Sequence, residues 1–527
     1  MTFGAARVFL AAAVLAELLS ACGGGGSSSA AASRANGDVP GNAAVYQPGV
    51  FKPASNFAQR CAAPRSGTAD VQGTLTDENN WLRSWTNDLY LWFSEVPDLD
   101  PSLYSSKLTY FSALKTPATT ASGAPKDKFH FTYSTDVWKQ MSESGQSAGY
   151  GAEFSLISAT PPRQVVVAYT NPNTPATTAP ANLARGAQIV TVDGVDVATS
   201  TDTDTLNGGL FPTSAGETHV FGVRDLNSST TRTVTLTSAI VTSMPVQNVG
   251  TFNIGGGKVG YMLFNDHLAT AEPALIQAFT SLSNAGATDL VLDIRYNGGG
   301  YLDIASEVAY MIAGTRTTGK HFETTQFNSR HPTVDPVTSQ TITPLEFHST
   351  AQGFSTSVSQ GSPLPTLNLS RVFVLTGPDT CSASESIINS LRGIDVQVIQ
   401  IGRTTCGKPY GFYPQDNCGT TYFSIEFRGV NNAGYGDYTD GFQPGTETAS
   451  NLSVVAGCQV ADDFTHALGD TAEARFGAAL QYRANGSCPA VSLNGGALQK
   501  AAARPNLAAI DGTVPKTPWL ENRILRH

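Results

Sequence analysis

The chain has 527 residues, enough for several domains and a large hydrophobic core. Charged residues make up only 14% of it, against about a quarter in a typical soluble protein, and glycine is frequent. This composition favours an exported, β-rich protein with long loops. The net charge is −10 and no basic cluster is present, which argues against nucleic-acid binding.

The first 22 residues have the pattern of a targeting signal. Arg7 precedes an apolar stretch from Val8 to Leu19, interrupted by Glu17, and Leu19-Ser20-Ala21-Cys22 follows. This order resembles a bacterial lipoprotein signal, which implies removal of residues 1–21 and a lipid on Cys22. The alternative is a soluble secreted protein cut after a small residue. Residues 23–67 begin with GGGGSSSAAAS and predict a flexible tether.

Six further cysteines are available for disulfides in an oxidising compartment: Cys61, Cys381, Cys406, Cys418, Cys458 and Cys488. Short intervals suggest the pairs Cys406–Cys418 and Cys458–Cys488. Cys61 and Cys381 would then pair with each other or stay free. No CxxC spacing occurs, so the sequence predicts no zinc or other metal site.

Residues 68–140 predict a helical N-terminal region. Its aromatic residues fall near helical spacing, at Trp81, Trp85, Tyr90, Trp92 and Phe93. Such a stripe is typical of a packing face that is buried against the rest of the protein.

Residues 141–247 change to short strands and turns. A glycine-containing loop at 149–154 precedes the strand 165–168, a small helix with the segment ARGAQIV (184–190) and the hairpin Val192-Asp193-Gly194. This order resembles a PDZ domain, which binds an extended peptide as an added strand. Tyr150, Gly151 and Ala152 would then bind the terminal carboxylate of that peptide. The alternative is a generic β-rich spacer.

Residues 248–447 predict an α/β core. Strands are expected at 258–262 and 290–295, helices at 271–282 and 304–312, and Asn297-Gly298-Gly299-Gly300 opens the second helix. Glycines between a strand and a helix let backbone N–H groups approach a ligand closely. Residues 320–365 are polar and predict an irregular hairpin.

The segment 371–408 continues this pattern. Val372 to Leu375 predict a buried strand, and Cys381-Ser382-Ala383-Ser384-Glu385 leads into a helix. Ser382 therefore lies near unpaired backbone N–H groups and the positive end of the helix dipole. A second strand then leads to a turn that contains Lys408, so the fold can place the lysine beside the serine.

The remaining segments contain no further candidate catalytic residues. A strand is expected at 421–427, and Asp437 and Asp440 lie in a loop without the ligand series of an EF-hand, so we interpret them as turn formers. Residues 448–527 predict a C-terminal helical region and tail, with helices at 461–468 and 472–482.

Three elements, in this order, resemble the tail-specific or C-terminal processing serine peptidases: the PDZ-like segment, the strand that ends in DIRYNGGG, and the SASE segment followed by TxxGK. The resemblance covers roughly residues 80–447. It implies an α/β fold with a crotonase-like peptidase core, a Ser–Lys dyad and no cofactor. Carried over, Ser382 is the nucleophile and Lys408 the general base. Gly299 or Gly300 and the amide of Ala383 would donate to the oxyanion.

The chemistry of the two residue types supports this assignment. A serine hydroxyl needs an adjacent base, and lysine serves only when it is neutral, so burial must lower its pKa. Many family members carry glutamine four residues after the lysine, and some carry aspartate eleven after the serine. Here those positions are Phe412 and Gly393, with Asp395 two residues later.

Several alternatives remain at the site. Ser382 could be an ordinary helix N-cap, Ser384 is a rival nucleophile, and Cys381 is a rival thiol. A Ser-His-Asp enzyme lacks a GxSxG motif here, and we interpret His267, beside Asp266, as structural.

The sequence thus predicts a serine endopeptidase of the bacterial cell envelope, attached to a membrane through lipid, that cleaves unfolded or C-terminally recognised polypeptides. The alternative is a non-catalytic, lipid-anchored envelope protein that binds peptides on a peptidase-like fold. A binding module needs neither Ser382 nor Lys408. A sugar-binding role has no support in the sequence.

Overall fold

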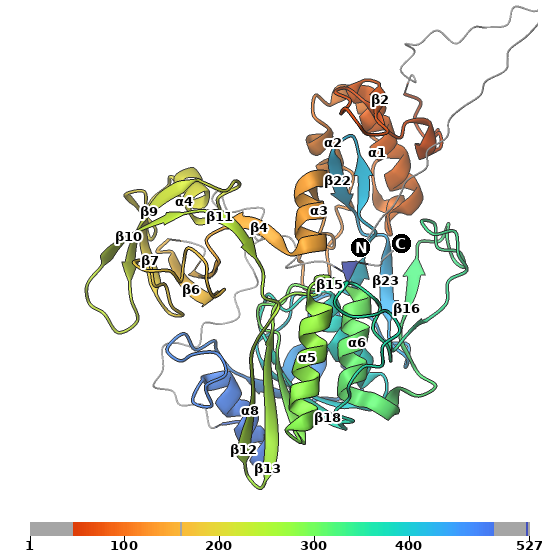
Figure 1. Ribbon diagram of the computed structural model, residues 1–527. Coiled ribbons are helices and arrows are strands. Elements are labelled where there is room, and N and C mark those ends of the chain that lie inside the picture. Colours follow the sequence, from red (N-terminus) through yellow and green to blue (C-terminus); the bar gives the residue numbers. More distant parts are fainter. Residues whose placement is uncertain (1–45, 159–160, 490–522, 525–527) are drawn as a thin grey trace, which may run out of the picture. The chain divides into compact units, whose positions relative to one another are not determined.

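The computed structural model describes residues 46–158, 161–489 and 523–524 (Figure 1). The predicted signal peptide, Cys22 and the start of the tether lie outside these residues. The described chain is a mixed helix-and-sheet protein, which confirms the predicted α/β class.

The N-terminal region is mainly helical. It contains two short parallel strands, three α-helices and one strand that pairs with the core: β1 (Arg60–Cys61), β2 (Val71–Gln72), α1 (Leu75–Leu89), α2 (Lys107–Ala113), β3 (Phe131–Ser134) and α3 (Thr135–Ser144). Helix α1 begins with a capping box, because Asp77 N–H donates to Thr74 Oγ1 and Thr74 N–H donates to the Asp77 carboxylate.

The predicted aromatic packing face is present on α1. Trp81 and Trp85 stack with ring centroids 5.1 Å apart, and both are buried against Tyr422 of the core. The helix ends at Leu89, so Trp92 lies beyond it, where its ring meets Tyr410 edge-on at 4.7 Å. Aromatic side chains therefore join the N-terminal region to the core.

A β-rich domain follows. Its strands and helix are β4 (Gln146–Gly149), β5 (Ala152–Ser158), β6 (Gln164–Thr170), β7 (Gln188–Val192), β8 (Val195–Asp196), α4 (Thr203–Leu210), β9 (Thr218–Arg224), β10 (Arg232–Thr237) and β11 (Ala239–Thr242). The main sheet has the order β10-β9-β7-β6-β5, with β8 paired to β7. A separate cluster of buried apolar residues fills this domain, and β4 pairs with β11 where the chain enters and leaves it.

The small helix predicted with ARGAQIV is wrong. Arg185 and Gly186 form a turn that leads into β7, and the helix of this domain is α4. The Arg185 side chain donates to Ala168 O and to Tyr296 Oη of the core instead of lying on a helix surface. These buried contacts favour the irregular backbone at this position.

The core is built on a seven-stranded sheet of order β12-β13-β14-β18-β19-β25-β24. Its strands are β12 (Val246–Ile254), β13 (Gly257–Phe264), β14 (Asp289–Asp293), β18 (Arg371–Thr376), β19 (Gln397–Gly402), β24 (Gln443–Gly445) and β25 (Val454–Gln459). Only β12 runs antiparallel to its neighbour. The crossover helices are α5 (Ala271–Asn284), α6 (Leu302–Ala313) and α7 (Ala383–Arg392).

Helices cover both faces of this sheet. Leu290 and Leu292 point into the apolar cluster that contains α5, α6 and α7, whereas Val291 points into the cluster of α8 (Ala474–Asn485). Figure 1 shows α5 and α6 side by side. A strand buried on both faces reads as a continuous apolar run, as the sequence does here.

Smaller strands complete the core: β15 (Gly300–Tyr301), β16 (His321–Phe327), β17 (Leu345–Glu346), β20 (Tyr410–Gly411), β21 (Gln415–Asn417), β22 (Thr420–Phe423), β23 (Phe427–Val430) and β26 (Arg523–Ile524). The strand predicted over 421–427 is two strands in different sheets, because β22 pairs with β3 and β23 pairs with β16 and β20. The predicted hairpin at 320–365 contains β16 and β17.

The C-terminal region differs from the prediction. Residues 454–459 form β25, which joins the main sheet, so the core continues past residue 447. Residues 461–468 are turns and not a helix. Asp462 there accepts hydrogen bonds from Arg185 and Arg295, which favours a loop shaped around buried charges. The second predicted helix is confirmed as α8.

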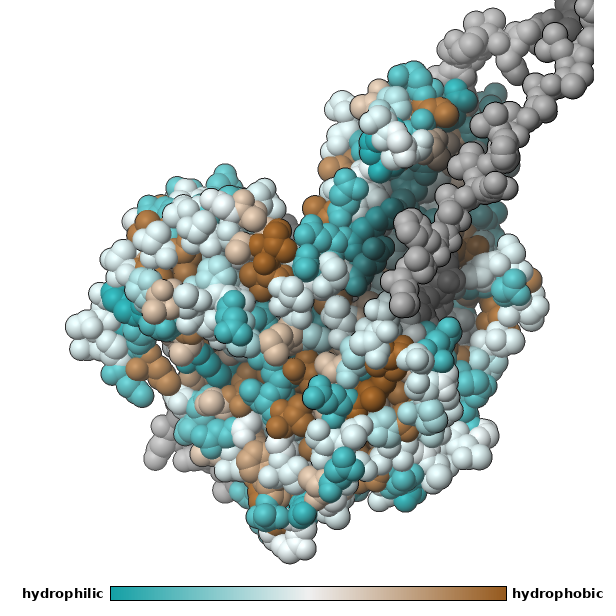
Figure 2. All heavy atoms as spheres, in the orientation of Figure 1, coloured by the Kyte–Doolittle hydropathy of each residue, from teal (hydrophilic) through white to brown (hydrophobic). Residues whose placement is uncertain are grey.

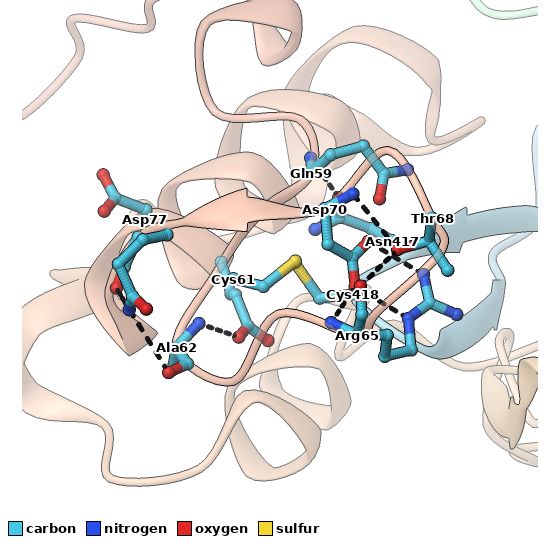
Figure 3. The surroundings of a disulfide bond; sticks show 12 residues. Gln59, Cys61, Ala62, Arg65, Thr68, Asp70, Asp77, Asn417 and Cys418 are labelled. Atoms are coloured by element: carbon cyan, nitrogen blue, oxygen red, sulfur yellow. Dashed lines mark hydrogen bonds and ion pairs between the residues drawn. A yellow bond between two sulfur atoms is a disulfide. The ribbon is translucent and has the colours of Figure 1, made fainter.

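Three disulfides connect the described cysteines. Cys458–Cys488 is as predicted, but Cys406–Cys418 is wrong: Cys418 pairs with Cys61 and Cys406 pairs with Cys381. Figure 3 shows the Cys61–Cys418 bond, beside which Gln59 N–H donates to Asn417 Oδ1. The prediction paired the cysteines that are nearest in the sequence, whereas the tertiary fold brings together cysteines that lie far apart in the chain.

Within the described ranges, no helix is both long and apolar enough to cross a membrane. The face drawn in Figure 2 has polar residues interspersed among apolar ones.

Candidate active site

Three loops meet at the carboxyl edge of the parallel sheet. Strands β14, β18 and β19 are neighbours, and they lead to the glycine loop, to Ser382 and to Lys408 respectively. The carboxyl ends of parallel strands are the usual location of a ligand site in open α/β sheets. The order of the strands therefore brings together segments that lie far apart in the sequence.

Ser382 begins helix α7 in an uncommon conformation. Its φ is +61° and its ψ is −116°, a region that residues other than glycine rarely occupy. The side chain is buried, and its Oγ has no hydrogen-bond partner among the described residues. The hydroxyl therefore does not cap the helix. A strained residue with an unused polar atom is typical of a functional site.

One carboxylate links the segments of Ser382 and Lys408. Glu385 Oε2 accepts from Ser382 N at 2.9 Å and from Lys408 N at 2.8 Å, while Oε1 accepts from Gly407 N at 2.9 Å and from Thr405 Oγ1. Because a single oxygen binds both backbone nitrogens, the structure brings Ser382 and Lys408 together. Burial raises the pKa of Glu385, and these hydrogen bonds oppose the rise.

A disulfide adds a covalent link at the same place. Cys381 directly precedes Ser382, and its partner Cys406 lies two residues before Lys408. Cys381 is therefore no free thiol and cannot be a nucleophile. Among the described residues, Cys381, Glu385 and Cys406 form the one group with metal-ligand spacing, and the sulfur–sulfur bond accounts for it.

Lys408 is buried among aromatic rings. Its Nζ lies 4.6 Å from the ring centroid of Phe412 and 4.9 Å from that of Phe129, and the lysine has no exposed surface. Phe129 belongs to the N-terminal region. Lys128, its neighbour, donates to Cys406 O at 2.9 Å. The N-terminal region therefore forms one wall around Lys408.

The glycine loop adopts backbone angles that need glycine. Gly299 and Gly300 have φ of +101° and +137°, and a Cβ on Gly300 would lie 2.4 Å from His267 O. Gly299 N–H donates to Asn297 Oδ1 at 2.9 Å. That N–H is therefore engaged within the loop. Ala383 is the first residue of α7, where N–H groups have no partner within the helix.

His267 is a buried residue beside this loop. Its Nδ1 lies 2.9 Å from Asn297 Oδ1, which as an acceptor requires the proton on Nδ1. Nε2 then carries a lone pair, and it has no partner among the described residues. Burial lowers the pKa of His267 to about 3, so the ring is neutral at ordinary pH. The sequence identified this residue only as structural.

Ser384, the rival nucleophile, is occupied. Its Oγ donates to Asn297 O at 3.0 Å, and Cys381 N–H donates to the same carbonyl oxygen at 3.0 Å. These two bonds fix the start of α7 against the glycine loop. Ser384 therefore has a structural role in the fold.

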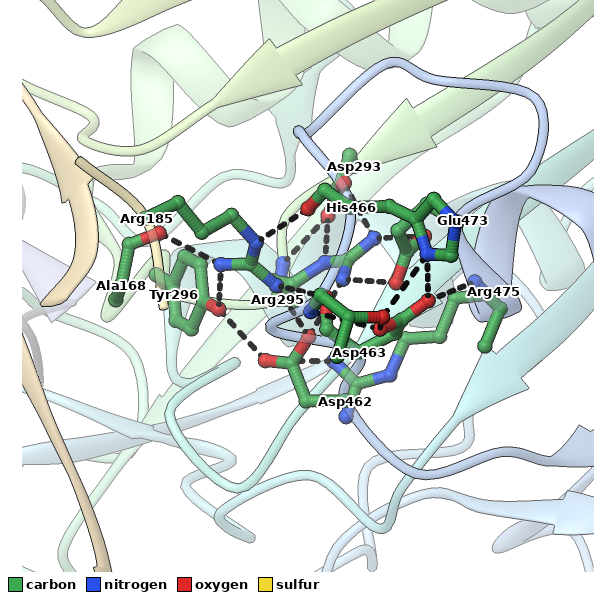
Figure 4. A network of polar contacts seen from close by, with 12 residues as sticks. Ala168, Arg185, Asp293, Arg295, Tyr296, Asp462, Asp463, His466, Glu473 and Arg475 are labelled. Atoms are coloured by element: carbon green, nitrogen blue, oxygen red, sulfur yellow. Dashed lines mark hydrogen bonds and ion pairs between the residues drawn. The ribbon is translucent and has the colours of Figure 1, made fainter. Parts of the chain in front are cut away.

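A buried charge network supports the DIRYNGGG segment (Figure 4). Arg295 donates to Asp293 at 2.8 Å, to Glu473 at 2.8 Å and to Asp462 at 2.7 Å. Burial opposes ionisation of Asp462, but the charges of Arg475, Arg295 and Arg185 outweigh it and hold the pKa of that carboxyl well below its ordinary value. Arg185 of the β-rich domain also donates to Tyr296 Oη at 2.7 Å.

The three residues expected to bind a peptide terminus lie at the start of β5. Tyr150 is buried, and its hydroxyl donates to Gly209 O of α4 at 2.9 Å. A Cβ on Gly151 would meet Thr174 at 2.4 Å, and Ala152 is the first residue of β5. Among the described strands, β5 pairs only with β6, so its other edge carries no strand.

Sequence reasoning missed four residues of this site. Glu385 has a recognisable signal, because Ser382 and Glu385 have the spacing of a capping box. Asn297 directly precedes the three glycines and could have been found with them. Phe129 and the environment of His267 have no local signal, because only the tertiary fold brings them to the loops at the sheet edge.

Residues 258–412 match the model of peptidase family S41, and residues 77–134 match that of the peptidase S41 N-terminal domain. A crystal structure from Bacteroides fragilis, assigned to the S41 proteases, is 21% identical with a TM-score of 0.56. It covers 77% of this chain and 97% of the other, and this likeness concerns the fold.

Two curated relatives match part of the chain in sequence. The carboxyl-terminal-processing protease of Picosynechococcus sp. is 30% identical over 176 residues, which are 32% of this chain and 39% of the relative. The chloroplastic C-terminal processing peptidase of Tetradesmus obliquus is 33% identical over 181 residues, or 32% and 38% of the two chains. The match spans less than half of each relative. The chain thus matches two models of peptidase family S41 in order, the N-terminal domain before the peptidase domain, and both of these relatives are C-terminal processing peptidases.

Proposed function

We propose that this protein is a serine endopeptidase of the cell envelope that cleaves polypeptides with a Ser382–Lys408 dyad. One observation carries the proposal: Glu385 Oε2 accepts from the backbone N–H of both residues. The two residues are thereby held together, with the lysine buried and the Ser382 hydroxyl without a hydrogen-bond partner in the part of the chain that the structure describes.

In this mechanism, neutral Lys408 takes the proton from Ser382 Oγ as the oxygen attacks the carbonyl carbon of a peptide bond. The tetrahedral intermediate carries its negative charge on the former carbonyl oxygen. Lys408 then returns the proton to the leaving amine, and water releases the acyl group by the same steps. The strained backbone of Ser382 and the bonds to Glu385 keep the nucleophile in place without substrate.

The oxyanion donors are Gly300 N–H and Ala383 N–H. Ala383 is the first residue of α7, so the helix dipole adds a favourable potential there. Gly299 N–H is bonded to Asn297 Oδ1, so a donor role for it would require that bond to break. We therefore propose that Gly299 maintains the shape of the loop and does not donate to the oxyanion.

An extended polypeptide suits this site. Strand β15, which contains Gly300, pairs in parallel with the two-residue strand β26. An edge that accepts one extended segment can bind another through main-chain hydrogen bonds, with little dependence on sequence. The free edge of β5, in the PDZ-like domain, offers a second place for a strand, where Gly151 and Ala152 would bind a terminal carboxylate.

The test is hydrolysis of an unfolded protein by a soluble form that begins at residue 23. Fragments identified by mass spectrometry should include internal cleavage products, which an exopeptidase does not make. The alternative function is a non-catalytic peptide-binding protein of the envelope. It predicts binding of the same protein with no fragments at all.

The pH dependence should identify the base. A lysine acts only when neutral, so kcat/KM should rise towards alkaline pH through a single ionisation as Lys408 loses its proton. His267 is the competing base, because its Nε2 has no partner within the described ranges. Its pKa of about 3 predicts a rate that is flat from mildly acidic pH upwards. The measurement is kcat/KM against pH for the native enzyme and for His267→Gln. A flat profile would assign the proton transfer to His267.

Attachment to the membrane should depend on Cys22. We expect Cys22→Ala to prevent lipid attachment and to move the protein from the membrane fraction to the soluble fraction. The physical reason is that firm anchoring requires the several acyl chains of a lipoprotein. Fractionation with immunoblotting measures the change. Continued sedimentation of the variant with membranes would show that another segment holds the protein there.

A further inference from the structure

We propose that Phe129 and Phe412 hold the Lys408 side chain by their ring faces and act as positioning residues for the base. This inference rests on the proposed role of Lys408. Nζ lies 4.6 Å from one ring centroid and 4.9 Å from the other, within the range of a cation–π interaction.

The two rings come from different parts of the chain, and both are fixed. Phe412 has no exposed surface, and its ring lies 5.2 Å from that of Phe423. Phe129 N–H donates to Asp127 Oδ1 at 2.9 Å, and Asp127 in turn accepts from Tyr90 Oη at 2.6 Å. Neither ring can turn away without disturbing a buried contact. Lys408 is thus held in a defined, water-excluding environment.

Such an environment acts on the lysine in two opposite ways. Burial disfavours the ammonium form, whereas the negative ring faces attract it. Leucine at either position would keep the apolar enclosure and remove the attraction. The ammonium should then become less stable relative to the neutral amine. The alkaline limb of the activity profile should therefore move to lower pH.

Other charged or titratable groups surround Lys408 and remain unchanged by these substitutions. Glu385 on α7 accepts from the Lys408 backbone N–H, and Lys128 donates to Cys406 O. Asp127 accepts from the Phe129 backbone N–H, and burial raises the pKa of Tyr410 on β20. Arg428, Asp437 and Asp440 act electrostatically on Tyr410.

The experiment compares Phe129→Leu and Phe412→Leu with the control Phe322→Leu. Phe322 is also buried, its ring packs edge-on against that of Phe347, and none of the cation–ring contacts of the described residues involves it. We expect the limb to move to lower pH by roughly half a unit to one unit in the first two variants and to stay in place in the control. An unchanged limb, a move to higher pH, or an equal shift in the control would overturn the proposal.

A second measurement keeps the test valid where a leucine variant does not fold. Phenylalanine carrying one, two or three fluorines, placed at position 412, weakens the ring's attraction for a cation while its shape hardly changes. The limb should move to lower pH in step with the number of fluorines. No trend would reject the proposal.

Failure of the proposed function can be told apart from failure of this inference. The ¹³C shift of Lys408 Cε, assigned by its loss in Lys408→Ala, follows the titration of the amine without any activity. A titration that moves with fluorination supports the ring contacts even in an enzyme whose rate does not depend on Lys408. A titration that does not move refutes them even in a fully active enzyme.

Discussion

Replacing Ser382 with alanine should reduce kcat/KM for peptide hydrolysis by about 10³-fold or more, with little change in KM. The substitution removes the atom that, in the proposed mechanism, forms the covalent bond with the substrate. The hydroxyl makes no hydrogen bond to any described residue, so the fold should keep its Tm. The measurement is steady-state hydrolysis of an unfolded protein or a labelled peptide, together with thermal unfolding.

Two serines on the same helix serve as controls. Ser390→Ala removes a buried hydroxyl that also has no partner among the described residues, and it should leave the rate unchanged. Ser384→Ala loses a bond to Asn297 O and should retain most of the activity. Full activity in Ser382→Ala combined with loss in Ser384→Ala would move the nucleophile to Ser384.

Glu385→Gln should lower kcat/KM by about 10²-fold, because it misplaces both residues of the proposed dyad at once. The native carboxylate accepts from three backbone N–H groups and one hydroxyl, and all four are donors. A glutamine offers one oxygen and an NH₂ group, which would face donors and repel them. At least one buried N–H would lose its partner, so the Tm should also fall.

The matched control is Glu447→Gln. Glu447 is partly exposed and pairs with Arg392 at the other end of the same helix, so this variant removes an equal charge far from the nucleophile. It should retain both rate and Tm. A Glu385→Gln enzyme with native kcat/KM would mean that the backbone bonds to Glu385 do not position the dyad, and that the Cys381–Cys406 disulfide suffices.

The sequence by itself determined the α/β class and most core elements. The apolar runs 290–292 and 372–375 are continuous because their strands are covered by helices on both faces, and such runs can be recognised without a structure. Ser382, Lys408 and the glycines were found because strand, turn and helix follow one another locally. The capping-box spacing of Ser382 and Glu385 is local in the same way.

Only the tertiary structure decided the contacts between distant segments. The pairs Cys61–Cys418 and Cys381–Cys406, the strand β25 within the main sheet and the loop at 461–468 all depend on partners remote in the chain. Phe129 reaches Lys408 because the N-terminal region packs on the core through aromatic rings. Periodicity and turn chemistry report the local backbone, whereas such contacts arise from side chains that meet only when the sheet, its edge loops and the N-terminal region assemble.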